Sequence, residues 1–463
     1  MSAFSGDLRD DDALRQRDRR RLGRGDRLPS MTSDGLGGAA SQRLWQQLAR
    51  CEAPGINTLD PSSGTGLPPW RAARGANVID VDGNRHIDLT AGFGVAAVGH
   101  RHPRVVDAVR RQAGHLLHGL GDAAAHPLRA RLAARLVVRA PVDDAIVYPA
   151  VSGADAIEIA HKTACLATGR PGLVTFDTGY HGLTFGALRA TARADFRAPF
   201  GALLAEDLVH RLPFGADPAA IDARIAAAAP AVGAVLVEPI VGREGVRLPP
   251  PGWLAAVAAV ARRRGALLIA DEIFTGFGRT GAWFAVEHDD VRPDLLCCGK
   301  AVAGGLPIGL VLGRRAVMDA WTHPGEARHT GTFVAHPLAW AAALATLDVL
   351  ENDDLPDRAR RLGDALAPRL ADWPRRFAAV AAVRGRGLLW GIAITSRTAA
   401  RDLAGRLARR GVLMLAGGAD GRVAQIAPPL TIHPRQLDFA LDAIEAALAD
   451  GSEAAAVSEE DGR

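Results

Sequence analysis

Two buried strands and the residues that end them stand out in the stretch Leu267–Lys300, LLIADEIFTGFGRTGAWFAVEHDDVRPDLLCCGK. The apolar residues 266–270 predict a buried strand that ends in an acidic pair beginning with Asp271. After a glycine-rich turn, a second apolar run, residues 295–298, leads to Lys300. Ligands of open α/β sheets bind at the carboxyl ends of the strands. We therefore expect a carboxylate and an amine to face one crevice.

This pair suits pyridoxal phosphate, which needs a lysine for its Schiff base and an acid to keep its ring nitrogen protonated. The sequence contains only two lysines, Lys162 and Lys300. Arginine stays protonated and cannot replace a lysine that acts as a nucleophile. A surface ion pair with Glu158, four residues earlier on a helical pattern, accounts for Lys162. Lys300 has no such partner; its alternative interpretation is an ordinary loop lysine.

Length and composition are typical of an enzyme with two or three domains, at 463 residues and a formal net charge of +4. This small charge predicts no nucleic-acid partner. The four cysteines have neither zinc-site spacing nor a disulfide pattern, so we expect reduced thiols, no metal and a cytoplasmic protein. The longest apolar stretch, residues 225–241, is interrupted by Pro230 and Glu238, so no membrane span is expected.

Strands alternate with helical patterns between about residues 90 and 350, which predicts a mainly parallel α/β sheet covered by helices. Asp82-Gly83 within residues 77–89 predicts a hairpin, and the Ser41 hydroxyl is expected to cap a helix that reaches Cys51. Residues 1–30 hold eight arginines and six aspartates with few apolar residues, so they are expected to be dispensable. The expected division is a disordered tail (1–40), an N-terminal segment (41–95), a large cofactor-binding domain (96–345), a small α+β domain (346–450) and a polar tail (451–463).

Two short motifs are typical of cofactor contacts. Ser152, Gly153 and Ala154 lie where a strand turns into a helix, and small residues there let backbone N–H groups bind a phosphate. Ser-Gly also begins many helices that bind nothing. Tyr180 and His181 stand between glycines after a strand, where an aromatic ring stacks on a flat heterocycle; an aromatic that fills the core beneath a loop is the alternative.

Nine motifs together resemble the class III aminotransferases, pyridoxal phosphate enzymes of fold type I. The resemblance spans about residues 65–445. In chain order the motifs are DVDGNRHIDL, SGADAIEIA, GYHGLTFGAL, EPIVGREGV, DEIFTGFGRTG, GKAVAGGLPIG, GTFVAHPLA, VRGRGLLWGI and APPLTI. The family implies an aminotransferase that moves an amino group from an amine or amino acid to a 2-oxo acid, by a ping-pong route through pyridoxamine phosphate. It also implies a homodimer with its sites at the subunit interface.

The resemblance implies roles for individual residues. Lys300 matches the Schiff-base lysine, and Asp271 matches the partner of the pyridine nitrogen. Thr332 matches a threonine that reaches the phosphate in the neighbouring subunit. The other cofactor-binding candidates are Ser152, Gly153 and Ala154 at the phosphate, Tyr180 and Ile273 on the two ring faces, and His181 and Glu238.

On the substrate side the chain departs from ornithine-type enzymes. Arg243 stands where those enzymes have a glutamate, Gln425 where they have an arginine, and Phe274 where a glutamine is usual. Substrate candidates are Phe93, Arg243 and Gln425. If Arg243 binds a carboxylate, 4-aminobutyrate, β-alanine or another acidic amine should react better than ornithine or putrescine. A solvated turn at Arg243-Glu244 is the alternative.

Other reaction outcomes stay open at this stage. Lyases, decarboxylases, epimerases and aminomutases use the same cofactor and fold, and they differ in which Cα bond stands perpendicular to the ring. A non-catalytic cofactor-binding regulator is a further alternative, although about 40 residues are too few for an added DNA-binding domain.

Overall fold

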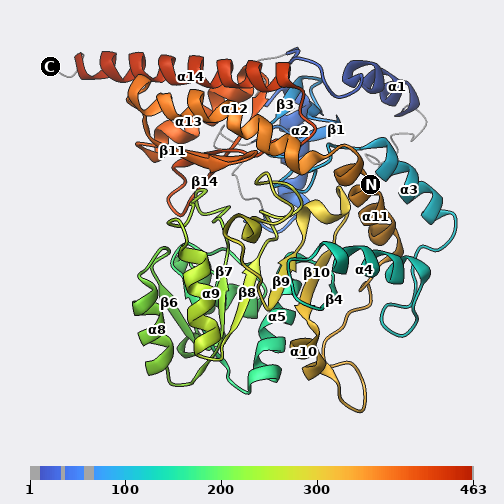
Figure 1. Cartoon of the computed structure of the whole chain (residues 1–463). Coiled ribbons are helices and arrows are strands. Elements are labelled where there is room, and N and C mark those ends of the chain that lie inside the picture. Colours follow the sequence, from blue (N-terminus) through green and yellow to red (C-terminus); the bar gives the residue numbers. More distant parts are fainter. Residues whose placement is uncertain (1–10, 33–36, 57–66, 461–463) are drawn as a thin grey trace.

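The computed structural model describes residues 11–32, 37–56 and 67–460 (Figure 1). Its largest sheet has seven strands, which run in the order β4 (Ala145–Ala150), β10 (Gly309–Arg314), β9 (Leu295–Cys298), β8 (Leu267–Asp271), β7 (Val232–Val237), β5 (Gly172–Phe176) and β6 (Val209–Leu212). Neighbouring strands from β9 to β6 are parallel, whereas β10 is antiparallel to β9 and β4. This confirms the mainly parallel α/β sheet.

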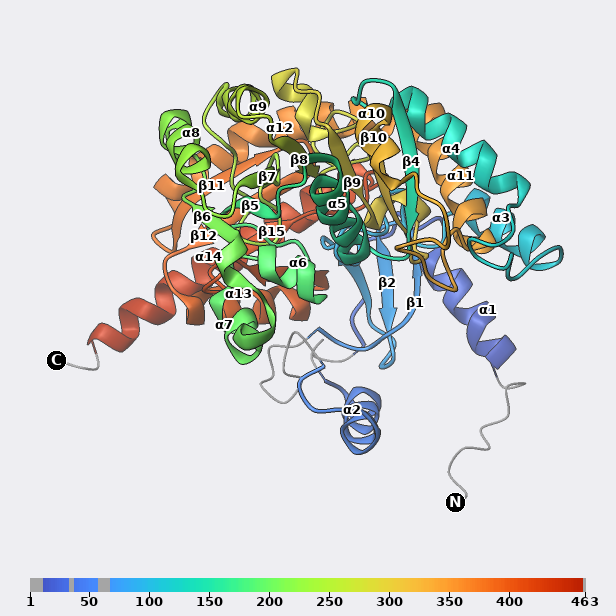
Figure 2. The same cartoon turned by 90° about the horizontal axis from the view of Figure 1, so that it is seen from below.

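Helices cover the large sheet on both faces (Figure 2). All of β8 is buried, as expected for a parallel strand between two helical layers. Its residues alternate: Leu267 and Ile269 join the core cluster of α5 (Gly153–Thr168), and Leu268 and Ala270 join that of α9 (Trp253–Arg263). The other helices of this part are α3 (Pro103–Ala113), α4 (Pro127–Arg139), α6 (Phe185–Ala190), α7 (Ala194–Arg197), α8 (Pro218–Ala227), α10 (Arg315–Met318) and α11 (Pro337–Asn352).

Two four-stranded sheets lie beyond the large one. The first is antiparallel, in the order β11 (Val380–Arg386), β12 (Leu389–Ile394), β15 (Val423–Ile426) and β14 (Leu415–Gly417). The second consists of β1 (Trp70–Arg74), β2 (Asn77–Asp80), β3 (Arg85–Asp88) and β13 (Val412–Leu413). The antiparallel pairing of β2 with β3 confirms the predicted hairpin, and β13 adds parallel to β3. The helices here are α2 (Ala39–Cys51), α12 (Leu355–Arg376), α13 (Arg397–Arg409) and α14 (Pro434–Glu460). The domain boundaries stay a prediction.

The N-terminal residues differ from the expected disordered tail of residues 1–40. Residues Asp11–Leu22 form helix α1, and Leu22 is fully buried. The Asp18 carboxylate accepts two hydrogen bonds from Arg71 on β1, and Ser30 forms a β-bridge with Arg85. Residues 1–10 and 33–36 lie outside the described residues. Long-range contacts therefore order a segment whose own sequence is strongly polar.

Helix α2 is capped differently from the prediction. Its N-cap is Gly38, not Ser41. Ser41 is buried in the first turn, and its hydroxyl donates to Asp82, in the β2–β3 turn. The Asp82 carboxylate also accepts the N–H groups of Ala40 (2.8 Å) and Ser41 (3.2 Å). A carboxylate from a distant turn thus satisfies donors that the first turn of a helix leaves free.

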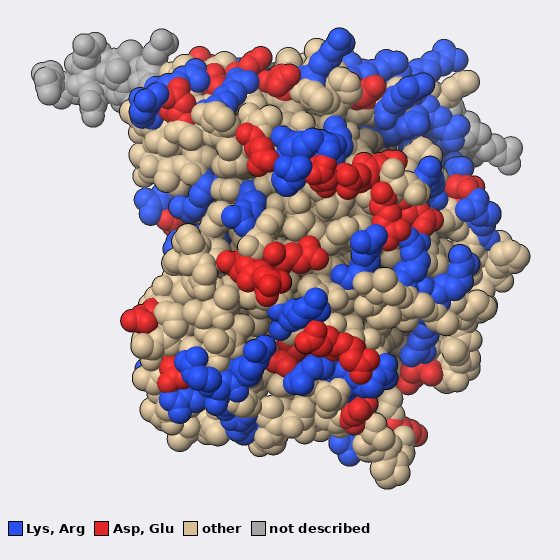
Figure 3. Space-filling view, in the orientation of Figure 1, with Lys and Arg blue, Asp and Glu red and all other residues tan. Residues whose placement is uncertain are grey.

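Acidic and basic side chains are interspersed over the face shown in Figure 3. In the described part of the chain, no helix has the length and apolar character needed to cross a membrane.

Candidate active site

Strand β9 positions Lys300 through one glycine. The chain leaves β9 at Gly299, and Lys300 follows with a φ of 43°, in the left-handed region that non-glycine residues seldom adopt. Its amine lies 4.9 Å from the centroid of the Phe274 ring. Burial lowers the pKa of Lys300, although the charges of Asp271 and Glu238 act in the opposite direction. A lysine with a lowered pKa is a better nucleophile near neutral pH.

Asp271 ends β8, beside β9, and is 4% exposed. Its Oδ2 atom lies 2.7 Å from Nδ1 of His181, which is also buried. Its Oδ1 atom accepts a hydrogen bond from the Ile273 N–H at 3.1 Å. Asp271 thus ends a strand that neighbours the one leading to Lys300, as the strand-end argument expects, and it also contacts a histidine from a separate part of the chain.

Glu238 follows β7 and holds two backbone segments at the site. Its carboxylate accepts the N–H of Tyr180 at 2.8 Å and the N–H of Gly242 at 2.9 Å. Burial raises the pKa of Glu238 to about 7; the nearby charge of Asp271 raises it as well, while His181 lowers it. Glu238 therefore fixes the backbone of Tyr180 rather than presenting a free carboxylate.

The residues 152–154 form a narrow turn at the start of α5. The Ser152 hydroxyl accepts the N–H of Asp155 at 3.1 Å, which caps the helix. A Cβ on Gly153 would come within 3.0 Å of the Ile273 side chain, so a larger residue would fill this space. Backbone donors at a helix N-terminus suit a phosphate. A lysine with a lowered pKa, a buried carboxylate and this turn together fit pyridoxal phosphate.

The Phe274 ring packs beside Lys300 and against two glycines, Gly94 and Gly242. A Cβ on Gly94 would lie 2.6 Å from the Phe274 ring and 3.7 Å from Cδ of Lys300. A Cβ on Gly242 would lie 2.2 Å from the same ring. Phe93, the residue before Gly94, is 55% exposed with a φ of 60°. The turn that contains Phe93 therefore adjoins Lys300.

Arg243 lies over the ring of Tyr180, with its guanidinium carbon 4.3 Å from the ring centroid. Gln425 does not take the free position expected for a substrate ligand. Its amide nitrogen donates to the carbonyl oxygens of Gly242 (3.0 Å) and Arg243 (3.3 Å). Gln425 thus supports the turn that presents Arg243.

Glu244, next in the chain, is 3% exposed, and neither carboxylate oxygen has a hydrogen-bond partner among the described residues. It lies 3.8 Å from Nη1 of Arg193 and 4.0 Å from Nε of Arg243. Burial raises the pKa of Glu244, while both arginines lower it. The interpretation of Arg243-Glu244 as a solvated turn does not fit a carboxylate this buried.

Sequence reasoning missed Arg193 and Phe196. The guanidinium of Arg193 lies 4.3 Å from the ring centroid of Phe196, and that of Arg243 lies 5.4 Å from it. The two residues lie next to and within the short helix α7. No local pattern marks them, because only the tertiary fold brings α7 over Tyr180.

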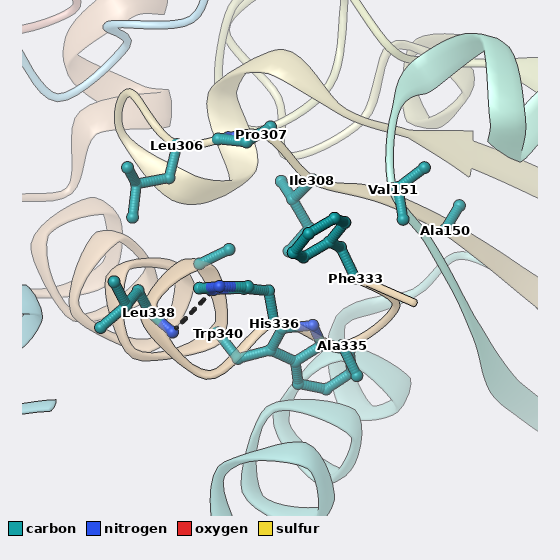
Figure 4. A pocket seen from close by; sticks show the side chains of 11 residues that line it. Ala150, Val151, Leu306, Pro307, Ile308, Phe333, Ala335, His336, Leu338 and Trp340 are labelled. Atoms are coloured by element: carbon teal, nitrogen blue, oxygen red, sulfur yellow. Dashed lines mark hydrogen bonds between the residues drawn. The ribbon is translucent and has the colours of Figure 1, made fainter. Parts of the chain in front are cut away.

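Thr332 lies in the segment before α11, with an exposed side chain. Its carbonyl oxygen accepts a hydrogen bond from Nε2 of His118 at 2.7 Å. Next to it, Phe333 is 63% exposed and lines an apolar cavity of about 390 Å³ together with Val151 and His336 (Figure 4). This cavity adjoins the 152–154 turn through Val151.

Comparison with known proteins agrees with this geometry. The family model Aminotransferase class-III matches residues 63–448. Acetylornithine aminotransferase of Mycobacterium tuberculosis is 42% identical over 386 residues, which cover 83% of this chain and 92% of the relative. Acetylornithine aminotransferase of Methanopyrus kandleri is 39% identical over 374 residues, 81% of this chain and 92% of the relative.

Solved structures of aminotransferases are also similar to this chain over most of its length. Ornithine aminotransferase of Toxoplasma gondii superposes with a TM-score of 0.81 at 30% identity, over 91% of this chain and 97% of that chain. An amine transaminase from an uncultivated Pseudomonas species, solved with pyridoxal phosphate bound, has a TM-score of 0.78 at 29% identity, over 86% of this chain and 98% of that chain.

Proposed function

The chain belongs to the class III aminotransferases, and we infer from this membership and from its site that Lys300 is the residue on which the reaction depends. The protein is a pyridoxal phosphate-dependent aminotransferase of fold type I. When bound, pyridoxal phosphate supplies an electron sink that stabilises negative charge at the substrate Cα. The observation that carries the assignment of Lys300 is its amine of lowered pKa at the end of β9, next to the strand that ends in Asp271.

The chain's own residues would divide the work as follows. Asp271, held by His181, would keep a proton on the ring nitrogen. Tyr180 and Ile273 would flank the ring, and the 152–154 turn would bind the phosphate through backbone N–H groups. The Lys300 amine would hold the cofactor and would move a proton to and from the substrate Cα. Glu238 supports Tyr180 through its backbone.

A half-reaction tests this function. The purified enzyme loaded with pyridoxal phosphate is mixed with an amino donor and no 2-oxo acid, and the products are quantified by chromatography. A transaminase converts one equivalent of bound cofactor into pyridoxamine phosphate and stops, and an added 2-oxo acid restores the starting form. A lyase, decarboxylase, epimerase or aminomutase turns over its substrate continuously without accumulating pyridoxamine phosphate. Continuous turnover of the donor alone would therefore overturn the assignment.

We also propose that the amino donor carries a carboxylate and has no second ammonium group. Arg243 presents its guanidinium over Tyr180. The nearby Glu244 is shared between Arg193 and Arg243, so Arg243 is not committed to one acidic partner. A planar guanidinium suits a carboxylate. N-acetylornithine, implied by the names of the acetylornithine aminotransferase relatives, fits this description because its α-amino group is acylated. 4-Aminobutyrate and β-alanine fit it too, whereas ornithine and putrescine do not.

A homodimer is the assembly we propose. Thr332 and Phe333 are exposed beside an apolar cavity, as expected of a segment that contacts a second subunit. The side chain of Thr332 would then reach the phosphate at the neighbouring active site. Light scattering after size exclusion should give the mass of two chains; a monomer that is fully active would contradict the proposal. A cytoplasmic location stays a prediction.

A further inference from the structure

Lys162, the second of the two lysines, does not form the expected ion pair with Glu158. The Glu158 carboxylate instead accepts the N–H groups of Gly186 (2.8 Å) and Ala187 (3.2 Å) and so supports α6. The Lys162 amine lies 2.9 Å from Nδ1 of His329, 167 residues away in the chain. Lys162 thus connects α5 to the segment that precedes Thr332.

His329 lies between an ammonium group and a carboxylate. Its Nδ1 faces Lys162, and its Nε2 lies 3.0 Å from Oδ1 of Asp155. An ammonium group can only donate a hydrogen bond, and an ionised carboxylate can only accept one. Nδ1 of His329 can therefore accept a hydrogen bond from Lys162 while Nε2 donates one to Asp155. Burial raises the pKa of Asp155, but the hydrogen bonds from His329 and Val151 and the charges of His329 and Lys162 bring it below its ordinary value.

The contacts among Lys162, His329 and Asp155 form a network, which at one end holds residues 152–154, the phosphate turn. The second oxygen of Asp155, Oδ2, accepts the N–H of Val151 at 2.9 Å, and the N–H of Asp155 donates to the Ser152 hydroxyl. Asp155 therefore closes the loop around Gly153 and Ala154, whose N–H groups are the proposed phosphate donors. A shift of Asp155 changes the direction of these donors.

The other end holds the segment that leads to Thr332. The His329 carbonyl oxygen accepts the Tyr148 hydroxyl at 2.6 Å, and the Thr332 carbonyl oxygen accepts Nε2 of His118 at 2.7 Å. Both ends of residues 329–332 are thus fixed by side chains of the same chain, while the Thr332 side chain is exposed. This arrangement directs the threonine outward.

We propose that Lys162, His329 and Asp155 are positioning residues that couple the phosphate turn of one active site to the Thr332 segment that serves the other. The inference rests on the proposed function, in which each phosphate is held by the 152–154 turn of one chain and by Thr332 of the second. It also accounts for the lysine at position 162. A compact ammonium group meets a single ring nitrogen, whereas the planar guanidinium of arginine is suited to two acceptors.

Binding of pyridoxal phosphate and of pyridoxal, which lacks the phosphate, tests the proposal. Each is titrated into the cofactor-free enzyme, and its affinity is followed by absorbance. In Lys162→Met the affinity for pyridoxal phosphate should fall about tenfold, the effect of one hydrogen bond to a charged group, while the affinity for pyridoxal stays unchanged. His329→Phe, which keeps the ring and removes both nitrogens, should behave likewise. Cys165→Ser, at an exposed position on the same helix, is the matched control and should bind both as the unaltered enzyme does.

An unchanged affinity for pyridoxal phosphate in both Lys162→Met and His329→Phe would overturn the proposal. An equal loss of affinity for pyridoxal phosphate and for pyridoxal would also overturn the proposal, because the effect would then not act through the phosphate. The unaltered enzyme must bind pyridoxal phosphate and complete the donor half-reaction; if it does not, the proposed function fails, whatever the variants do.

Mixed dimers test the coupling between sites. A chain with both Lys300→Ala and His329→Phe is combined with an unaltered chain, so that the unaltered chain carries the one Lys300 of the dimer. That Lys300 site has an intact Asp155 turn but receives Thr332 from the altered chain. The coupling predicts weaker pyridoxal phosphate binding at this site than in a mixed dimer with Lys300→Ala alone. Equal binding in the two mixed dimers would refute it.

Discussion

Nδ1 of His181 lies 2.7 Å from Oδ2 of Asp271, and both side chains are almost completely buried. The Ile273 N–H donates to the other oxygen of Asp271 at 3.1 Å. The histidine and this N–H therefore fix both oxygens of Asp271 at the position where the cofactor's ring nitrogen would need a counter-charge.

Asp271→Asn should keep the fold and lose roughly three orders of magnitude in turnover, about 4 kcal/mol of barrier. An amide cannot stabilise a protonated ring nitrogen by charge. Steady-state kinetics at saturating donor, with circular dichroism as the check on folding, measure the effect. A loss smaller than about tenfold, about 1.4 kcal/mol, would assign the charge to another residue.

Lys300→Ala should abolish turnover because no other lysine can take its place; Lys162 bonds to His329. The variant should still bind pyridoxal phosphate non-covalently through the 152–154 turn. Borohydride reduction followed by mass spectrometry checks this: the cofactor becomes attached to the unaltered chain and not to the variant. Attachment to the variant would show that Lys300 is not the residue that binds it.

Arg243→Ala should raise the KM for 4-aminobutyrate or N-acetylornithine with a smaller effect on kcat, because the lost interaction is with the substrate carboxylate. A loss of about tenfold in affinity is expected for one charge-assisted hydrogen bond. A simple alkylamine without a carboxylate is the matched substrate control, and its KM should not rise. If ornithine reacts efficiently with the unaltered enzyme, Arg243 is a structural residue. The same conclusion follows if the KM rises equally for the acidic amine and for the alkylamine.

Removal of residues 1–30 should lower the melting temperature, in contrast to the expectation from composition. The loss would remove α1, including the fully buried Leu22 and the Asp18–Arg71 pair. Leu22→Ala isolates the apolar contribution and should destabilise the protein by about 2–5 kcal/mol, as measured by urea unfolding. A chain that begins at Met31 and melts like the full chain would show that α1 packs without stabilising the fold.

Glu272 gives a pH dependence of stability. It is fully buried, and burial raises its pKa from 4.5 to about 7. Between these values the folded state holds a proton that the unfolded state has lost, so the free energy of unfolding falls as pH rises through this window. The Val286 N–H donates to Oε1 at 2.8 Å, and the Thr275 hydroxyl contacts Oε2.

Glu272→Gln mimics the protonated acid, since its amide nitrogen can donate to the Thr275 hydroxyl. Urea unfolding of both proteins between pH 4.5 and 8 measures the difference. The variant should be as stable as the unaltered chain at the acidic end and increasingly more stable than it as the pH approaches 7. A constant difference across the window would show that Glu272 is ionised throughout.

The positions of Asp271 and Lys300 follow from local sequence patterns, whereas the surroundings of the substrate candidates do not, for a physical reason. Asp271 and Lys300 end neighbouring strands, so the sheet places them through local patterns that can be read from the chain. Arg193 and Glu244 meet only because α7 folds over Tyr180. Gln425 was expected to face the substrate, but two backbone carbonyls 182 and 183 residues away bind its amide.

The same limit explains the N-terminal region. Helix α1 is strongly polar, so its composition predicts disorder. Asp18 and Ser30 find their partners in strands at least 50 residues further along the chain. Similarly, Ser41 was expected to cap α2, but the Asp82 side chain caps it from a turn 41 residues away. Composition reflects only the local conformational preference of a segment. These contacts depend instead on the position of the completed sheet.

The amide of Gln436, at the start of α14, donates to the carbonyl oxygens of Gly25 (3.2 Å) and Arg27 (3.1 Å). During synthesis, the segment that contains Gly25 and Arg27 must therefore wait for a partner that is synthesised 411 residues after Gly25. At 5–20 residues per second this delay is about 20–80 s. Until then the N-terminal residues 19–27 have only part of their binding surface, so released chains truncated before residue 436 should be cleaved by trypsin within residues 19–27, and the full chain should resist.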